Sequence, residues 1–370
     1  MNLVLTEEQE ELRDSVRRFL ASRSPMTRVR QVAETPEGYD RTLWEGMAGD
    51  LGLQGLAVPD RYGGAGFGQV EMSIVMEELG RALVPSPFLG SAVLAASTLM
   101  ALDDEDARRE LLPAIASGDT IATLAAAEGA GGWDGARVGT LAALDGDGWR
   151  LDGVKTLVPA GCQADLLVVT ARAGDELGFF AVEAGAPGLR RNELAGLDLT
   201  RRLARIELSG APARRLISED ATAALSRVLD LAALALAAEQ LGGLQRCLEM
   251  SVDYAKARAQ FGRAIGSFQA VKHMCAEMHV AMELARSAVR YAAWAADEQP
   301  DELPVAAGLA RAYCSEAFFR VAADTIQVHG GIGFTWEHDA HLYYRRAKSS
   351  ELLLGGPAQV REQLAERLGV

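Results

Sequence analysis

The order of local patterns along the chain restricts its possible folds more than any other feature. Helical periodicity extends to about residue 118, short strand-like runs separated by Gly and Asp follow to about residue 220, and long helical patterns fill the rest. A doubly wound nucleotide-binding fold needs strands that alternate with helices, so this order excludes it. We therefore predict an α+β multidomain chain with a helical domain at 1–118, an all-β barrel or sandwich at 119–220 and a helical bundle at 221–370.

Capping and turn signals place the individual elements. Thr6 and the Glu-Glu-Gln after it match a capping box, and further helices are expected at about 43–51, 70–83, 90–102 and 105–116. Strands are expected within 121–127, 140–144, 149–151, 166–170, 179–182 and 204–208, with a hairpin turn at 145–148. The last domain has helical patterns at 221–260, 268–297, 303–328 and from about 357, and helices this long are typical of a bundle that also contacts other subunits.

Composition excludes several classes of function. The chain has 37 Lys and Arg against 51 Asp and Glu, a net charge of -14, so a nucleic-acid partner is not expected. The four cysteines lie far apart, which argues against a disulfide framework or a zinc site and for a reducing, cytoplasmic location. The longest apolar run, Leu231 to Ala238, is short for a membrane span, so no membrane insertion is expected. His338 and His341 share a helix face, but without a third ligand nearby we predict no metal.

Two glycine-containing motifs are candidates for a phosphate or nucleotide site. Arg258-Ala-Gln-Phe-Gly262 ends one long helix, and Gln327-Val-His-Gly-Gly-Ile-Gly-Phe334 ends another. Glycine lets a backbone approach a ligand closely, and the guanidinium and amide groups are suited to phosphate or purine edges.

Together with other segments, these motifs resemble the acyl-CoA dehydrogenase family. The loop at 58–66, the Phe268-Gln-Ala270 start of a helix and Arg346-Ala-Lys348 follow the family's order, and the likeness covers essentially the whole chain. The resemblance implies a helical N-terminal domain, a central β domain and a C-terminal four-helix bundle. It also implies FAD as cofactor and a homo- or hetero-tetramer built as a dimer of dimers.

The resemblance further implies which residues contact FAD. One subunit would hold the pyrophosphate and adenosine half of a neighbour's FAD through Arg258, Gln260, Phe261, Phe268, Gln269, Gln327, Gly330 and Gly331. A positive guanidinium beside open backbone amides suits a diphosphate. A helix C-cap turn is the plain reading of the two adjacent glycines, and it is compatible with a cofactor role.

The flavin half of the family's site is altered. Residues 127–134 stand where the family has T-E-P-G-A-G-S-D, and Leu157-Val-Pro-Ala160 stands where it has W-I-T-N. The hydroxyl donors and the tryptophan are missing at these positions, although backbone amides remain. We therefore expect weaker contacts to the flavin ring.

The family's usual catalytic glutamate is also missing. Alignment from Arg346 places Leu354 where the family's Y-E-G-T turn carries the base, and a leucine cannot accept a proton. Some members carry the base on the long bundle helix, which makes Glu249 the first candidate and Glu239 the second. An ion-paired Glu249 is a plain alternative. Burial of Glu239 in its apolar stretch would raise its pKa, and a structural carboxylate fits there equally well.

Two functions follow from the resemblance. The first is FAD-dependent α,β-dehydrogenation of an acyl-CoA in fatty-acid or steroid breakdown, with electrons passed to an electron-transfer flavoprotein. The second is a non-catalytic partner subunit in a heterotetrameric acyl-CoA dehydrogenase, possibly for a steroid-derived CoA ester, contributing half of a shared FAD site. The retained adenosine-side motif, altered flavin side and absent base are what the second function predicts.

Overall fold

The computed structural model describes residues 3–129, 132–133, 135–146 and 148–369. The N-terminal helices are α1 (Glu7–Arg23), α2 (Met26–Ala33), α3 (Arg41–Gly49), α4 (Gln69–Arg81), the π-helix η3 (Leu89–Ala95), α5 (Ala96–Ala101) and α6 (Glu105–Ala116), with short 3-10 turns at Leu53–Gly55 and Asp60–Tyr62. Thr6 and Gln9 form the expected capping box at the start of α1. The helix expected at 90–102 is divided into π-helical and α-helical parts, and α2 was not anticipated.

The middle segment forms the predicted barrel. Its strands are β1 (Ala122–Ala125), β2 (Leu141–Asp145), β3 (Gly148–Pro159), β4 (Leu166–Ala173), β5 (Glu176–Glu183), β6 (Leu189–Glu193) and β7 (Leu203–Leu216). Pairings run from β4 to β2, β3, β7, β5 and back to β4, so these five strands close a ring. Strand β1 joins β4 in parallel and β6 joins β7 antiparallel. Asp145 pairs with Gly148 at the predicted hairpin.

The C-terminal segment is a bundle of long helices. Its elements are α7 (Ala221–Ala257), a small hairpin of β8 (Ala259–Gln260) and β9 (Arg263–Ala264), the 3-10 turn η5 (Ile265–Ser267), α8 (Gln269–Glu298), α9 (Leu303–His329), the 3-10 turn η6 (Gly330–Phe334), α10 (Ala340–Leu352) and α11 (Pro357–Leu368). Helix α7 therefore ends three residues before the expected end at 260. Helix α10 was not anticipated.

Helix α7 lies at the centre of the molecule and packs against α9, α4 and α8. A Cβ at Gly242 would lie 1.8 Å from a carbonyl oxygen of α4, and a Cβ at Gly80 would lie 2.0 Å from the Glu239 carbonyl oxygen. The N-terminal domain therefore packs backbone to backbone on the bundle. Within the described chain, α7 is also long and apolar enough to cross a membrane, a test that core helices also pass, and more than half of its most apolar stretch is buried.

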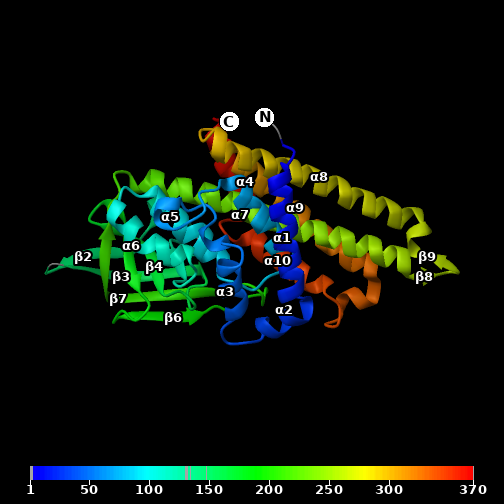
Figure 1. The fold of residues 1–370 in the computed structure, drawn as a ribbon, viewed down its shortest axis with the longest axis horizontal. Coiled ribbons are helices and arrows are strands. Elements are labelled where there is room, and N and C mark those ends of the chain that lie inside the picture. Colours follow the sequence, from blue (N-terminus) through cyan, green and yellow to red (C-terminus); the bar gives the residue numbers. More distant parts are fainter. Residues whose placement is uncertain (1–2, 130–131, 134, 147, 370) are drawn as a thin grey trace.

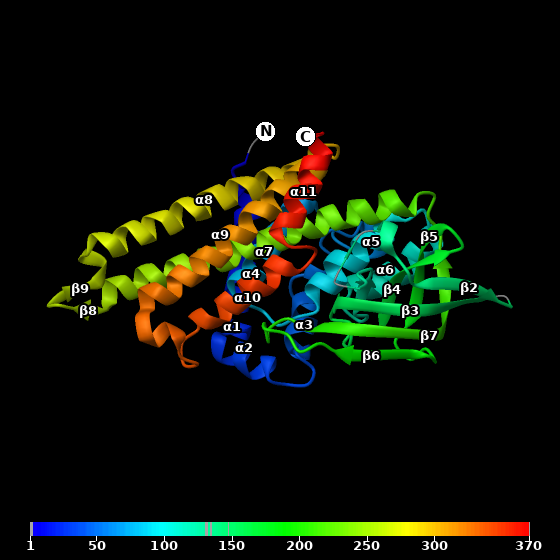
Figure 2. The same ribbon diagram turned by 180° about the vertical axis from the view of Figure 1, so that it is seen from behind.

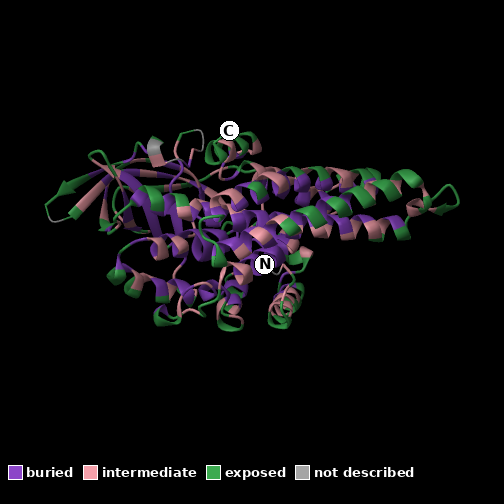
Figure 3. Ribbon diagram, turned by 90° about the horizontal axis from the view of Figure 1, so that it is seen from above, coloured by how far each residue is buried: buried purple, intermediate pink, exposed green. Residues whose placement is uncertain are grey.

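The two ends of the molecule are structurally different. Figures 1 and 2 show the barrel at one end and the β8–β9 hairpin at the other, where α7 and α8 extend beyond the rest of the chain. Figure 3 shows buried residues concentrated in the barrel and the middle of the bundle, and exposed residues toward the hairpin end. We call this end, residues 254–270 with 327–334, the bundle tip.

Candidate functional site

The bundle tip brings together the first predicted cofactor motif. Arg258 follows α7 directly, Gln260 lies in β8, and Phe261 occupies the turn with a φ of 52° and 91% exposure. The ring of Phe268 lies 6.1 Å from that of Phe261 and accepts the guanidinium of Arg263 at 4.0 Å from its centroid. Gln269 begins α8 and is exposed. These side chains therefore present a compact, open, positively charged surface.

The second predicted motif lies against the first. The ring of Tyr254, one helical turn before Arg258, lies 4.4 Å from that of His329, which immediately precedes Gly330. Gly330 caps α9 with a φ of 64°, so the C-cap reading is confirmed. A Cβ at Gly330 or Gly331 would meet nothing within 4 Å, and Gln327 is exposed. This backbone is therefore open to a ligand in the way that the cofactor reading needs.

The loop that replaces the family's first flavin segment is held by a buried ion pair. The carboxylate of Glu128 accepts bonds from the Gly139 amide at 2.7 Å, from the Thr140 hydroxyl at 2.6 Å and from Lys155 Nζ at 2.5 Å. Burial lowers the pKa of the fully buried Lys155 to about 8. Residues 130, 131 and 134 of the segment 127–134 lie outside the described residues, so only part of this prediction has a structural counterpart.

The second flavin segment ends β3 in an irregular conformation. Leu157 and Ala160 have φ values of 50° and 53°, in the left-handed region. The Pro159 carbonyl accepts a hydrogen bond from the Thr123 hydroxyl at 2.6 Å, and a Cβ at Gly90 of η3 would lie 2.9 Å from the same oxygen. Helix η3 therefore packs closely over this strand end, and residues 157–160 offer no aromatic ring for stacking.

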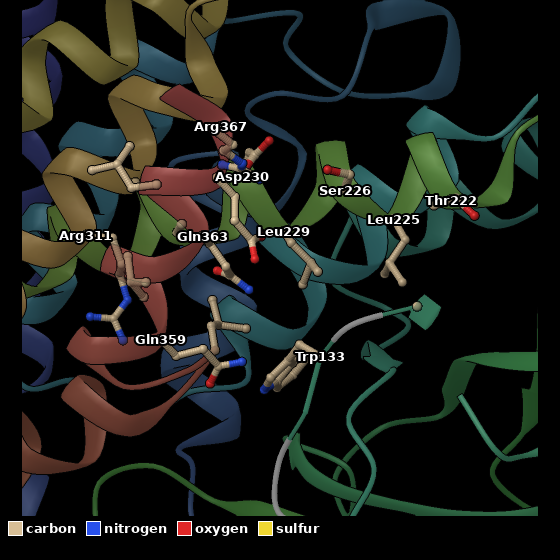
Figure 4. Close-up of a pocket in the computed structure, with 17 residues that line it drawn as sticks. Trp133, Thr222, Leu225, Ser226, Leu229, Asp230, Arg311, Gln359, Gln363 and Arg367 are labelled. Carbon is tan, nitrogen blue, oxygen red and sulfur yellow. The ribbon is translucent and has the colours of Figure 1, made fainter. Parts of the chain in front are cut away.

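The turn at Leu354 keeps a distinctive backbone although it lacks the carboxylate. Leu354 has a φ of 63° and is half-buried. Nη2 of Arg311 donates to the carbonyls of Ser350 and Leu353 at 2.6 and 2.7 Å, which fixes the end of α10. Leu354 also lines a cavity of about 360 Å³ between α7, α9, α11 and the barrel loop at Trp133. Figure 4 shows this cavity.

Glu249, the first candidate base, is engaged in ion pairs. Its carboxylate contacts Arg81 and, at 3.3 Å, Arg246, and it accepts a bond from Gln245 at 3.1 Å. It is not among the described residues that line the Leu354 cavity. These contacts match the ion-pair reading, and a catalytic role for Glu249 stays a prediction.

Glu239, the second candidate, lies in a buried network of opposite charges. It pairs with Arg201 and, at 3.1 Å, with Nη1 of Arg346, whose Nε binds Asp198. The expectation that its pKa is raised was wrong. Burial does favour the neutral form, but the two guanidinium groups outweigh it and hold the pKa of Glu239 below its ordinary value. These partners lie 38 and 107 residues away in sequence, so the local apolar stretch gave no sign of them.

The structure also places residues at the cavity that sequence analysis did not select. Asp230 on α7 and Arg367 on α11 form an ion pair at 2.8 Å in its wall, and Trp133 and Arg311 face it from the barrel loop and α9. Burial raises the pKa of Asp230. Asp230 precedes the apolar run of α7 by one residue, which is a local signal that was available. Across the described ranges, His338 and His341 belong to no group of three potential metal ligands.

Comparison with known proteins gives consistent results. The model of the acyl-CoA dehydrogenase N-terminal domain matches residues 6–119, and that of the C-terminal domain matches residues 221–369. Acyl-CoA dehydrogenase IpdE2 of Mycobacterium tuberculosis is 37% identical over 97% of this chain and 96% of its own length. Acyl-CoA dehydrogenase FadE27 of the same organism is 35% identical over 88% of each chain.

Solved structures show the same relationship in three dimensions. The ChsE4-ChsE5 complex from Mycobacterium tuberculosis matches with a TM-score of 0.90 and 32% identity, covering 100% of this chain and 99% of the matched one. A variant of the Tcur3481-Tcur3483 steroid ACAD matches with a TM-score of 0.89 and 35% identity over 98% of both chains. The fold prediction is therefore confirmed along the whole chain.

Proposed function

This chain belongs to the acyl-CoA dehydrogenase family of FAD-dependent flavoproteins, and we propose that it acts as one subunit of a mixed acyl-CoA dehydrogenase. In this assembly a companion chain carries the catalytic base, and the bundle tip of this chain holds the adenosine side of the companion's FAD. The reaction is α,β-dehydrogenation of an acyl-CoA thioester, for which FAD, when bound, would supply the acceptor of the hydride from the β-carbon.

The observation that carries the proposal is that none of the predicted positions offers a free carboxylate as catalytic base. Leu354 replaces the usual base, and both predicted substitutes are held by arginines. Glu239 is locked between Arg201 and Arg346, which stabilise its charged form and weaken it as a proton acceptor. A base must also reach the proton that it removes. Glu249 does not line the cavity at Leu354.

The two halves of the FAD site differ in how well they fit the cofactor. The Gly330 amide donates to the carbonyls of Gln327 and Ile326, but at the bundle tip Arg258 is exposed, with no ion pair to any described residue, and the backbone at Gly330 and Gly331 borders open space. These groups fit a pyrophosphate. Segment 157–160, which lies away from the tip and borders a pocket shared with Glu239 and Arg346, has no hydroxyl or aromatic side chain for the flavin. An FAD held at the tip therefore needs the barrel of another chain.

The solved relatives support this arrangement. The ChsE4-ChsE5 complex and the Tcur3481-Tcur3483 steroid ACAD are both described by two component names. On that basis we propose a heterotetramer whose substrate is a bulky, steroid-derived acyl-CoA. We further propose an electron-transfer flavoprotein as the electron acceptor, as membership of the acyl-CoA dehydrogenase family implies. The four cysteines form no disulfide, in keeping with the cytoplasm.

The test is flavin content. The chain is purified alone and after co-expression with a companion acyl-CoA dehydrogenase, and flavin absorption is compared with protein concentration. We expect little flavin in the chain alone and restored flavin, bleached by acyl-CoA, in the complex. Arg258→Gln should lower the flavin content of the complex, whereas Arg286→Gln, a half-buried α8 arginine paired with Glu283 and outside the tip, should not. One flavin per chain and bleaching in the chain alone would refute the proposal.

A self-sufficient dehydrogenase is the second candidate, and Asp230 is the observation that favours it. This carboxyl lies on the long bundle helix, lines the same cavity as Leu354 and has a pKa raised by burial. Its ion pair with Arg367 argues against a free base. If the isolated chain is active, Asp230→Asn should abolish bleaching while flavin content stays unchanged.

A further inference from the structure

The cavity at Leu354 combines an apolar wall with buried donors. Leu225, Leu229 and Leu354 form apolar wall surface, and Gln359 of α11 lies near its exposed side. Its volume of about 360 Å³ lies within the range of small-molecule sites. A cavity of this kind usually orients its ligand through a few polar groups.

Arg311 supplies a buried cation that forms no ion pair with any described residue. It is 1% exposed, and Nη2 alone makes its hydrogen bonds, all of them to carbonyl oxygens at the end of α10. Nε and Nη1 have no partner among the described residues, and no described carboxylate lies within ion-pair distance. Burial lowers the pKa of Arg311 to about 10, which still leaves it charged at neutral pH. A buried charge without a counter-ion is costly.

Trp133 supplies a second unused donor. The side chain is 5% exposed, and its Nε1 has no hydrogen-bond partner in the described part of the chain. Figure 4 shows the indole nitrogen turned toward the side of the cavity where Gln359 and Arg311 lie. A buried indole N–H normally finds an acceptor. Two buried, unpartnered donors on residues that line one cavity therefore point to an acceptor supplied by a ligand.

The charges around the cavity indicate what kind of acceptor this is. Asp230 and Arg367 neutralise each other at 2.8 Å, and Glu366 is exposed. Among the described residues that line the cavity, Arg311 is the cation without an ion pair. A phosphate carries more negative charge than one guanidinium can balance, whereas a carboxylate matches its single charge.

We propose that this cavity binds an apolar carboxylate, whose oxygens accept hydrogen bonds from Arg311 and Trp133 while its ring or branched body contacts the leucines. The carboxylate belongs either to a free acid or to the distal end of an acyl-CoA. The second source rests on the proposed function, and the first does not. Neither source requires bound flavin for the contact itself.

The experiment measures binding to the full-length chain, alone and in its complex, by calorimetry. The probes are cyclohexanecarboxylate and decahydronaphthalenecarboxylate, their methyl esters, and the mono-CoA thioester of cyclohexane-1,4-dicarboxylate with its methyl ester. We expect the carboxylates to bind at least tenfold more tightly than the esters. Trp133→Phe and Arg311→Lys should each weaken binding tenfold or more, since each removes a hydrogen bond to a charged group. Trp149→Phe, in β3 of the barrel, is the matched control and should leave binding unchanged.

The results distinguish the two sources of the carboxylate and include outcomes that would overturn the proposal. Binding of the free acids identifies a free carboxylate ligand, and carboxylate-dependent binding of the thioester alone identifies the tail of a substrate. Equal binding of acids and esters, no binding of any probe, or unchanged affinity in Trp133→Phe overturns the proposal. If Arg311→Lys does not fold, Trp133→Phe still tests the proposal. Flavin content is measured separately, so failure here leaves the mixed-subunit proposal intact.

Discussion

Replacing Glu239 by glutamine is expected to cost the fold about 3–5 kcal/mol of unfolding free energy, the typical cost of breaking a buried ion pair. Arg201 and Arg346 share Glu239 and Asp198 as counter-ions, and the four side chains are at most 7% exposed. The amide keeps the size of the side chain but leaves two buried cations with one anion. Glu249→Gln is the control, because that carboxylate is 31% exposed and its loss should cost at most about 1 kcal/mol.

Denaturant titrations of both variants between pH 3 and 8 provide the assay. Burial opposes ionisation of Glu239, but the two arginines outweigh it and lower its pKa in the folded chain. The stability that ionised Glu239 contributes is therefore fully present above its pKa in the unfolded chain, about 4. This stability is lost as the pH falls through the lower pKa of Glu239 in the folded chain. The difference between wild type and Glu239→Gln should shrink in acid. A cost below about 1 kcal/mol at pH 7, or a difference that grows in acid, would refute the reasoning.

Two further changes probe the packing and the barrel. Gly242→Ala should destabilise the chain by about 1–3 kcal/mol or more, because the new Cβ would lie 1.8 Å from a carbonyl oxygen of α4. A melting curve unchanged from wild type would contradict this backbone contact. Lys155→Met should remove a rise in stability between about pH 8 and 10, where the unfolded lysine still binds the proton that the buried one has lost. Denaturant midpoints of both proteins across this range measure the rise, and parallel pH profiles would argue against the lowered pKa.

The sequence correctly predicted those helices and strands whose caps, turns and apolar spacing lie within a short stretch of the chain. Helix α6 matches the expected 105–116, because Asp104 caps it and its apolar spacing is regular. The β2–β3 hairpin follows from Asp-Gly at its turn. Strand β6, Leu189–Glu193, was missed because its residues are mostly polar and its burial is incomplete. Its position depends on pairing with β7, which no short window of sequence contains.

The residues of the candidate site also differ in whether their roles could be predicted from local sequence. Arg258 and Gly330 lie in contiguous motifs, so their exposure at helix ends could be expected from spacing and glycine content. The charge state of Glu239 depends on Arg201 and Arg346, which approach from other elements. A buried carboxylate alone would have a raised pKa, and only the tertiary contacts reverse the direction.

Counter-ions also separate a structural buried arginine from one that points to a ligand. Arg346 is compensated by Asp198 and Glu239, and Arg290 lies 3.6 Å from Glu77. Burial of these charges is balanced within the chain, so nothing further is required to explain them. Arg311 is buried as deeply, yet its described neighbours offer carbonyl oxygens on one side and a cavity on the other. The lack of a described carboxylate within ion-pair distance of Arg311, more than the presence of the cavity, is what makes an external carboxylate the physically favoured partner.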